Sequence, residues 1–178
     1  MRIWMSAALL LTSAAAANAQ TPYAGMQTRP IMALSEQQVA DLSAGRGMGL
    51  ALAAELNGYP GPVHVLELAD KLDLSPDQRA SIQRLFDSMK AEAVPLGSKL
   101  IELEANLDRQ FAGHTVTPDS LRASTAAVAA TQGALRETHL KYHLSTVAVL
   151  SPGQIQRYAE LRGYGGETEP IEHHHNHH

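Results

Sequence analysis

The chain has 178 residues, of which 18% are charged and 4% aromatic, with a formal net charge of −4 and no cysteine. A negative chain lacks the basic surface that general nucleic-acid binding requires. Without cysteine it can form neither a disulfide nor a thiolate metal site, so a metal would have to be held by His, Met or carboxylates. So few aromatic residues favour an elongated helical protein that forms a homodimer over a compact globular core.

Residues 1–19 have the three parts of a secretory signal peptide. Arg2 lies near the start, an apolar run extends through Leu11 and the alanines that follow, and Ala17-Asn18-Ala19 forms a cleavage site. The apolar run is too short for a comfortable membrane span, so a signal is a better interpretation than a membrane anchor. Removal of Arg2 leaves 13 basic residues against 18 acidic ones, a formal charge of −5.

Residues 20–34, with two prolines and no periodicity, are predicted to be a flexible lead to a helical domain over 35–164. A weak helix-start signal at Leu34-Ser35-Glu36-Gln37-Gln38 predicts a helix from about Glu36 to Leu56, interrupted by the run Gly45-Arg46-Gly47-Met48-Gly49. This run is not a phosphate-binding loop, because no strand precedes it and it lacks the third glycine of the dinucleotide fingerprint.

A dense turn cluster at residues 57–62 ends the first helical region. Residues 63–72 then have the pattern of a short helix. His64 and Glu67 are three residues apart in it, so they share one face.

Two near-copies of one five-residue signal frame the longest helical patterns of the chain. They are Leu74-Ser75-Pro76-Asp77-Gln78 and Leu150-Ser151-Pro152-Gly153-Gln154. In each copy the serine can cap a helix, the proline fits the first helical position, and the glutamine can reach back to the cap. Both copies therefore predict helix starts.

A long antiparallel helical hairpin is predicted between the two copies. After Pro76 an apolar seam runs in steps of three and four residues to Phe111, and Pro95 is expected to kink or briefly break that helix. Residues 112–116 form a tight connection, and Thr117 caps a second helix with a seam that reaches Thr146. A short loop makes the two helices antiparallel neighbours. The fold class is therefore all-α.

The chain ends in a short helix and a histidine-rich tail. Residues 155–161 form the terminal helix, and residues 165–178 form a flexible tail after Gly163. Five of the nine histidines of the chain lie in this tail: His173, His174, His175, His177 and His178. They are predicted to bind a metal loosely at neutral pH. The alternative origin of the tail is a purification tag, although Asn176 interrupts the run.

The paired Leu-Ser-x-x-Gln motifs around a hairpin, behind a signal peptide, resemble the Spy/CpxP family of periplasmic proteins. That family has paired Leu-Thr-x-x-Gln motifs and includes extracytoplasmic chaperones and heavy-metal sensor or resistance proteins. The resemblance covers roughly residues 63–164, and serine in place of threonine keeps the capping chemistry. It implies a hooked, all-helical, usually dimeric protein of the periplasm.

His139 and His143 are four residues apart on one helix face, a spacing that lets two imidazoles hold one ion. If the hairpin turns near residues 114 and 115, facing residues have numbers that add up to about 229, which brings Met89 and Asp87 into range. A second fold-back near Leu74 places His64 within about a turn of His143.

The resemblance supports the same ligand set, because the metal sensors of the family take ligands from an early helical segment and from an H-x-x-x-[HM] pair on the last long helix. The predicted core ligands are therefore His64, His139 and His143, with Glu67 in place of a second histidine. The ion would be Zn, Cu, Ni or Co. The alternative is that His139 is a buried core histidine and that the other two are unrelated surface residues.

No enzyme is predicted, because the sequence contains no nucleophile elbow, phosphate loop, cysteine nucleophile or His-Glu-x-x-His motif. The first functional hypothesis is a periplasmic metal-binding protein that acts in metal sensing or resistance. The alternative is an ATP-independent holdase chaperone that binds unfolded envelope proteins on a concave helical surface. A third possibility is a dimeric scaffold that docks on an inner-membrane sensor protein.

Overall fold

The computed structural model describes residues 23–164, so the predicted signal peptide and the histidine tail lie outside the described residues. Every regular element in this part of the chain is helical, as the all-α prediction requires. The elements are, in chain order, η1 (Met26–Thr28), α1 (Glu36–Ser43), α2 (Leu52–Glu55), α3 (Pro62–Glu67), α4 (Pro76–Ala112), α5 (Pro118–Val147) and α6 (Pro152–Arg162).

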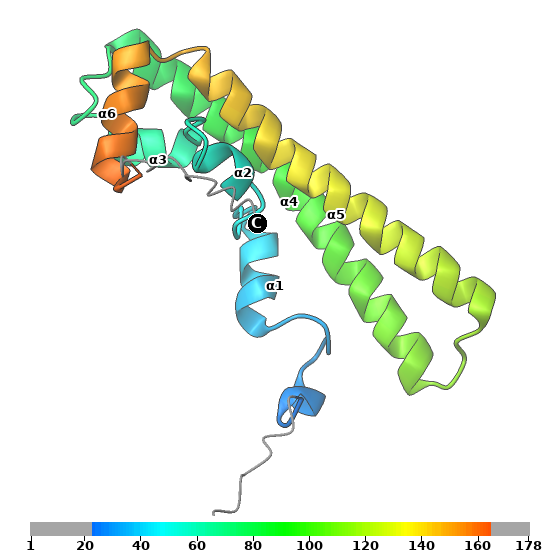
Figure 1. Ribbon diagram of the computed structural model, residues 1–178. Helices are drawn as coiled ribbons and strands as arrows, with labels where there is room; N and C mark the ends of the chain where they lie inside the picture. Colours follow the sequence, from blue (N-terminus) through cyan, green and yellow to red (C-terminus); the bar gives the residue numbers. More distant parts are fainter. Residues whose placement is uncertain (1–22, 165–178) are drawn as a thin grey trace, which may run out of the picture.

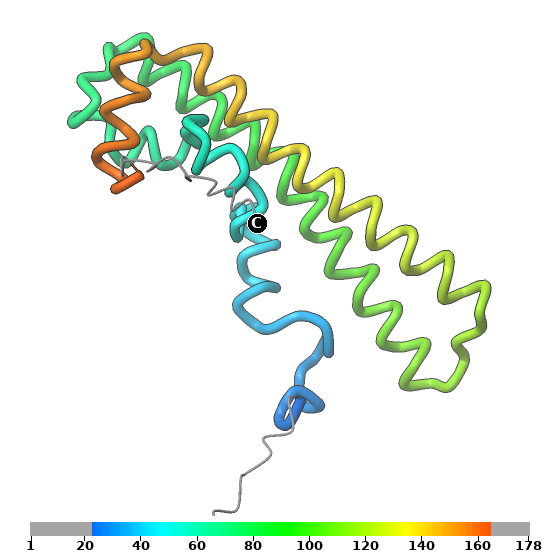
Figure 2. The backbone as a smooth tube through the Cα atoms, in the orientation of Figure 1, coloured from blue at the N-terminus to red at the C-terminus, as the bar shows by residue number. Residues whose placement is uncertain are grey.

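Helices α4 and α5 form the predicted antiparallel hairpin, and α1, α2, α3 and α6 lie along one side of it (Figures 1 and 2). The helix starts were predicted correctly because the interactions that determine them are local. A capping side chain accepts a hydrogen bond from the backbone of the third helical residue, and proline follows the cap. These caps are Ser75, Thr117 and Ser151. His114 lies in the connection and is exposed, with a positive φ of 52°.

The pairs that bond across the hairpin define its register. Gln110 Nε2 donates to Ser124 Oγ at 2.9 Å, and the Tyr142 hydroxyl donates to Glu92 at 2.8 Å. The residue numbers of both pairs add up to 234 rather than the predicted 229, because the connection extends to the Thr117 cap.

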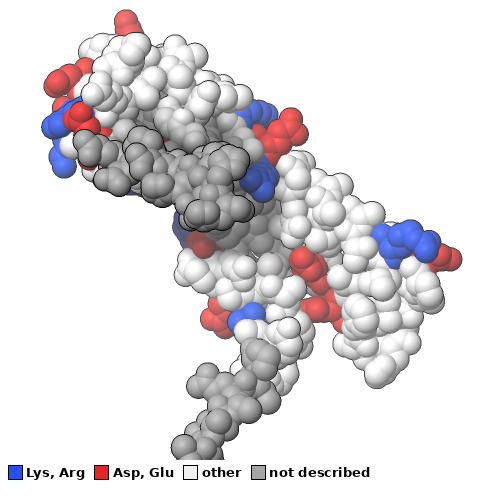
Figure 3. Space-filling view, in the orientation of Figure 1, with Lys and Arg blue, Asp and Glu red and all other residues white. Residues whose placement is uncertain are grey.

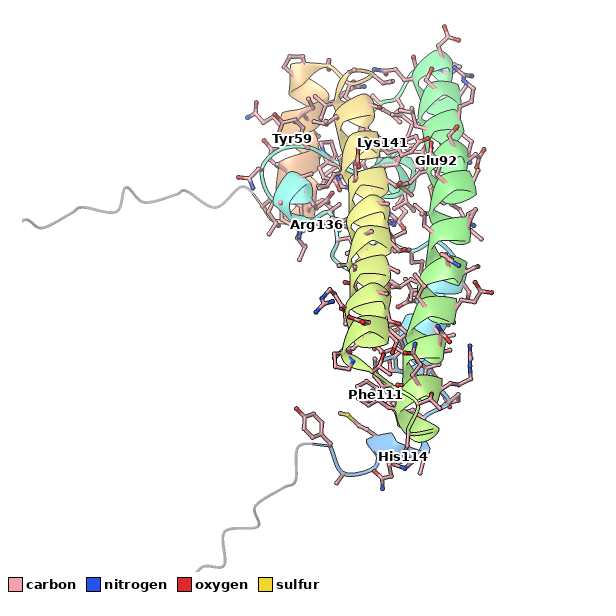
Figure 4. The ribbon with its side chains drawn as sticks, turned by 90° about the vertical axis from the view of Figure 1, so that its right-hand side faces the viewer. Tyr59, Glu92, Phe111, His114, Arg136 and Lys141 are labelled. Carbon is pink, nitrogen blue, oxygen red and sulfur yellow. The ribbon has the colours of Figure 1, made fainter. Side chains whose placement is uncertain are left out.

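An ion pair lies beside the Tyr142 bond. Lys141 of α5 also reaches Glu92 of α4, as Figure 4 shows. The hydrogen bonds from Lys141 and then from Tyr142 lower the pKa of Glu92.

Helix α4 continues through Pro95, so the predicted interruption does not occur. Ala91 and Pro95 both lie on the exposed side of the helix. The carbonyl of Ala91, which loses its partner at Pro95, can therefore be hydrated. The opposite side, with Ala93 and Gly97 buried, packs against the rest of the protein and keeps the helix continuous.

The glutamines of the two repeated motifs bond to each other, and we call Gln78 and Gln154 the glutamine clasp. The Oε1 atom of each accepts from the backbone N–H of its own capping serine. Each Nε2 donates to the other glutamine, at 2.9 and 3.1 Å. Gln78 also donates to the carbonyl of Val149, and Gln154 to that of Leu72. The motif therefore caps two helices and joins their starts.

The helix predicted over residues 36–56 is divided into α1 and α2, with an irregular segment from residue 44 to 51. Gly45 and Gly49 have positive φ values of 66° and 84°, and Met48 between them has a φ of 44°. The glycine run therefore turns the chain between the two helices.

Helix α1 crosses α4 at close range. A Cβ at Gly97 would lie 2.2 Å from the carbonyl oxygen of Leu42, so only glycine permits this approach.

Two buried apolar clusters hold these elements together. The first, near the glutamine clasp, contains Val65, Ala69, Leu72, Leu74, Ile82, Leu150 and Tyr158. The second, where the N-terminal segment packs on the hairpin, contains Ile31, Leu34, Leu42, Ala93, Leu100 and Leu135. The end of the segment predicted as a flexible lead is thus part of the packed body. Toward the hairpin turn the predicted seam opens, and Phe111 and Leu121 are 52% and 37% exposed.

The face of the molecule seen in Figure 3 is mixed in charge. Figure 3 shows lysine and arginine atoms beside aspartate and glutamate atoms in small groups, separated by uncharged surface. None of the helices in residues 23–164 combines the length and the apolar character needed to span a membrane.

Candidate functional site

Side chains from distant parts of the chain line one cavity of about 590 Å³. It is bounded by residues 44–67, by the facing sides of α4 and α5, and by the end of α6. Its lining includes all four predicted core ligands and the methionine expected beside them: His64, Glu67, His139, His143 and Met89. Asp87, also expected nearby, bonds to Gln83 and is not in the lining. The two fold-backs inferred from the sequence therefore lead to one cavity.

Helix α5 supplies His139 and His143 from its buried face, and they are only 3% and 7% exposed. Two glycines make room for the rings. A Cβ at Gly47 would lie 3.5 Å from His139 Nδ1, and one at Gly61 would lie 2.8 Å from His143 Nε2. The glycine run and the turn cluster of the sequence thus let the backbone approach both imidazoles.

The ring of His143 is fixed by a backbone hydrogen bond. Its Nδ1 lies 2.6 Å from the carbonyl oxygen of Tyr59. A carbonyl can only accept, so Nδ1 carries the proton, and in the neutral ring Nε2 holds the lone pair. This is the arrangement by which proteins orient a metal-binding imidazole.

His139 is a neutral ring with an unpaired nitrogen. Burial, and to a smaller extent the neighbouring His143, lowers its pKa below the ordinary histidine value, which favours the uncharged form at pH 7. Its Nε2 is buried and has no hydrogen-bond partner within the described residues. Such an atom is the kind that a bound ion or water satisfies.

His64 faces the cavity from α3. Its Nδ1 lies 3.1 Å from Glu67 Oε2, and the two side chains are 36% and 59% exposed. A carboxylate accepts, so this contact again leaves Nε2 of the neutral ring as the free nitrogen. Glu67 thus makes the contact by which a carboxylate orients a metal-binding imidazole, and its predicted role as a fourth ligand stays a prediction.

Glu55 is the important residue that the sequence prediction missed. Its carboxylate is 7% exposed and accepts from Gly61 N–H at 3.1 Å and from the hydroxyls of Tyr158 and Tyr164. Arg162 lies 3.7 Å away. Burial and then the Glu55 contact raise the pKa of Tyr158. Glu55 thereby holds Gly61 against His143. The signal in the sequence is a single charge within the apolar run ALAAEL.

The imidazoles share a cavity without forming a finished metal cluster. Within residues 23–164, no three His, Asp or Glu side chains come close enough together to hold one ion. The predicted core ligands are divided between α3 and α5. The five tail histidines lie outside the described residues. Metal binding by all of these residues stays a prediction.

Exposed apolar side chains follow one another in the segment that lines the cavity. We call Met48, Leu52, Leu56 and Tyr59 the apolar rim; they are 40 to 58% exposed, and the first two also line the cavity. Four large apolar side chains within twelve residues of one surface segment are typical of a surface that contacts another molecule.

Comparison with known protein families gives a match over much of the chain. The profile described as "LTXXQ motif family protein" matches residues 63–162, more than half of the chain. This region contains both Leu-Ser-x-x-Gln copies and the whole hairpin. Searches among curated proteins and among solved structures found no significant match.

Proposed function

The chain belongs to the LTXXQ motif family. On this basis we propose that it is an exported periplasmic protein that binds a transition-metal ion in the cavity. The protein would act in metal sensing or resistance. One observation carries the proposal. Three imidazoles line the same cavity, and two of them have Nδ1 bonded to an oxygen acceptor, which leaves Nε2 free to bind a metal. The predicted signal peptide of residues 1–19 supports export.

His139 and His143 are the anchoring pair in this proposal. They lie one turn apart on a rigid helix, and the unpaired Nε2 of His139 gains a partner when an ion binds. His64 joins them from α3 with Glu67 behind it, which requires a movement of the α3 side chains across the cavity. The tail histidines would form an accessory site that collects ions. Zn, Cu, Ni and Co are the candidate ions.

The test uses the full chain, purified from the periplasm of an expressing bacterium, with its N-terminus determined by mass spectrometry. All five tail histidines are changed to asparagine, so that only the cavity is measured. Titration of Zn²⁺ and of copper against a competing chelator is expected to give a dissociation constant in the micromolar range or below. Affinity that stays in the millimolar range would rule out the core site.

Two variants locate the binding. His139→Asn with His143→Asn should weaken binding at least about 100-fold, since loss even of an outer-shell partner typically costs 10–100-fold. His114→Asn is the matched control, because this histidine is exposed at the hairpin turn, and it should change nothing. Binding should also weaken below about pH 6.5, since protons compete for the imidazoles.

The apolar rim favours holdase activity as a second candidate function. Metal-free protein would then suppress the aggregation of an unfolded envelope protein. Replacing Met48, Leu52 and Leu56 by serine should abolish that suppression, because the three side chains are exposed and supply the apolar contact area. Unchanged suppression would exclude the rim as the client surface.

The exposed seam near the hairpin turn supports a homodimer. A second copy could cover Phe111 and Leu121, which are exposed. Sedimentation equilibrium of the full chain is expected to give twice the monomer mass, and Phe111→Ser with Leu121→Ser to reduce it. Docking on an inner-membrane sensor is the partner proposal that periplasmic crosslinking would test.

A further inference from the structure

We propose that the ion selected by this cavity is Cu(I), held by imidazole nitrogens of α5 together with the thioether sulfur of a methionine. The inference rests on the proposed function, because it names the ion that the same cavity binds. It arises from the donor atoms, from the charges that line the cavity and from the small number of ligands that converge.

Two methionines line the cavity. Met89 of α4 is 5% exposed, and Met48, in the glycine run of residues 45–49, is 42% exposed. Met48 is also one of three non-glycine residues with a positive φ in the described part of the chain. Residues other than glycine keep this conformation only where their surroundings impose it. In a protein without cysteine, thioether sulfur is the soft donor, and soft donors select Cu(I).

Three of the four carboxylate oxygens in the lining, which are the atoms that harder ions prefer, already accept hydrogen bonds. The Glu55 carboxylate accepts from Gly61, Tyr158 and Tyr164. Glu67 is bonded to His64 Nδ1. A divalent ion that took the Glu55 carboxylate would break the contacts that hold Gly61 against His143, whereas Cu(I) needs neither carboxylate.

The charges around the cavity give a divalent ion no advantage. Three cationic side chains, Arg46, Lys90 and Arg162, line it together with two carboxylates, and Arg46 is paired with Asp41 outside the lining. With neutral imidazoles there is therefore no excess of negative charge. Such an excess would attract Zn²⁺, Ni²⁺ and Co²⁺ twice as strongly as Cu(I), because the Coulomb energy doubles when the charge of the ion doubles.

The low number of convergent ligands fits the same ion. No three His, Asp or Glu groups of the described residues meet at one point, and structural zinc sites typically use four ligands. Cu(I) commonly binds only two or three ligands. His139, His143 and Met89 would supply two nitrogens and one sulfur from the two long helices, so His64 is not required as a ligand.

The experiment measures how much the affinity for each ion depends on sulfur. The full chain with its five tail histidines changed to asparagine is titrated without oxygen, with copper kept as Cu(I) by ascorbate and in competition with bathocuproine disulfonate. Zn²⁺ is titrated in parallel against a zinc chelator. The variants are Met89→Leu and Met48→Leu, which nearly conserve volume. Met32→Leu is the control, because Met32 is exposed and outside the lining.

Met89→Leu is expected to lower the Cu(I) affinity at least about tenfold and to change the Zn²⁺ affinity little. Met32→Leu is expected to change neither affinity. X-ray absorption at the copper edge should show a sulfur neighbour that the Met89→Leu and Met48→Leu double variant lacks. Unchanged Cu(I) affinity in the double variant, or a copper site with nitrogen neighbours only, overturns the copper inference. Zn²⁺ binding that depends on His139 then still supports the proposed function, whereas failure of both ions to bind overturns the proposed function as well.

Discussion

Replacing Gln78 by glutamate tests whether the glutamine clasp, rather than helix capping alone, explains the repeated motif. The substitution keeps the oxygen that closes the capping box with Ser75. It removes the amide hydrogens, which reach the carbonyl of Val149 and Oε1 of Gln154, both at 2.9 Å. It also places a carboxylate beside two oxygen atoms. The capping box is therefore kept, and the contacts that the amide makes across the clasp are lost.

The size of the effect follows from these two partly buried bonds. A hydrogen bond contributes about 1 kcal/mol net, and more when its acceptor is left unpaired, so the two bonds together amount to about 2–3 kcal/mol. A domain of this size loses roughly 2–4 °C in melting temperature for each kcal/mol. We therefore expect Gln78→Glu to melt roughly 4–12 °C lower than the unchanged protein.

Gln38→Glu is the matched control. Gln38 closes the same capping box with Ser35 at the start of α1, but within the described residues its side chain bonds only to that cap. Both variants gain one negative charge in the first turn of a helix, where the helix dipole favours it by about 0.3–1 kcal/mol.

Thermal unfolding followed by circular dichroism at pH 7 compares the two variants. The melting temperature of Gln38→Glu should stay within about 2 °C of the original, since surface changes of this kind are typically within about 0.5 kcal/mol. Equal losses in both variants, or no loss in Gln78→Glu, would refute the clasp as a stabilising contact.

Three further predictions concern stability. Gly97→Ala should lower the free energy of unfolding by about 1–3 kcal/mol or more, because the new Cβ forces α1 away from α4. Gly133→Ala has open space around its Cβ and should raise the free energy of unfolding by about 0.5–1 kcal/mol. Urea unfolding measures both changes. The pKa of His139 is lowered in the folded state, so as the pH falls this histidine is protonated in the unfolded chain before it is protonated in the folded one. The free energy of unfolding should therefore fall as the pH drops below about 6.5. His139→Gln should make the free energy of unfolding depend less on pH, as measured by urea titrations at pH 7.5 and 5.5. Tyr158→Phe should cost about 1–3 kcal/mol, because it removes a donor from the buried Glu55 carboxylate, and a stability equal to that of the original chain would contradict the role given to Glu55.

The starts of the long helices could be predicted from the sequence, because a cap, a proline and a polar side chain at the third helical position, all within four residues, determine them locally. The glutamine clasp could not, since Gln78 and Gln154 look like ordinary capping residues until the whole chain folds. The continuity of α4 at Pro95 depends on which side of the helix faces solvent. The register of the hairpin depends on where its connection ends.

The positions of the cavity residues along the helices could be predicted to within about one helical turn, but the orientations of their side chains could not. Two fold-backs place His64 and the α5 imidazoles at one height, because helix geometry fixes those distances. The orientation of each ring depends on tertiary contacts such as the Tyr59 carbonyl and the close approach of Gly61. Glu55 was missed because its hydroxyl partners are 103 and 109 residues away.

That long separation implies an order of assembly during folding. Glu55 lies in the first part of the described chain, and Tyr158 and Tyr164 lie at its end, so the carboxylate stays hydrated until α6 docks. The hairpin can form before that moment, since its contacts are local, whereas closing a loop of about a hundred residues comes later. Maturation of the pocket is therefore the final event, and a chain halted before α6 would have a hairpin with an open, water-filled wall where the imidazoles face.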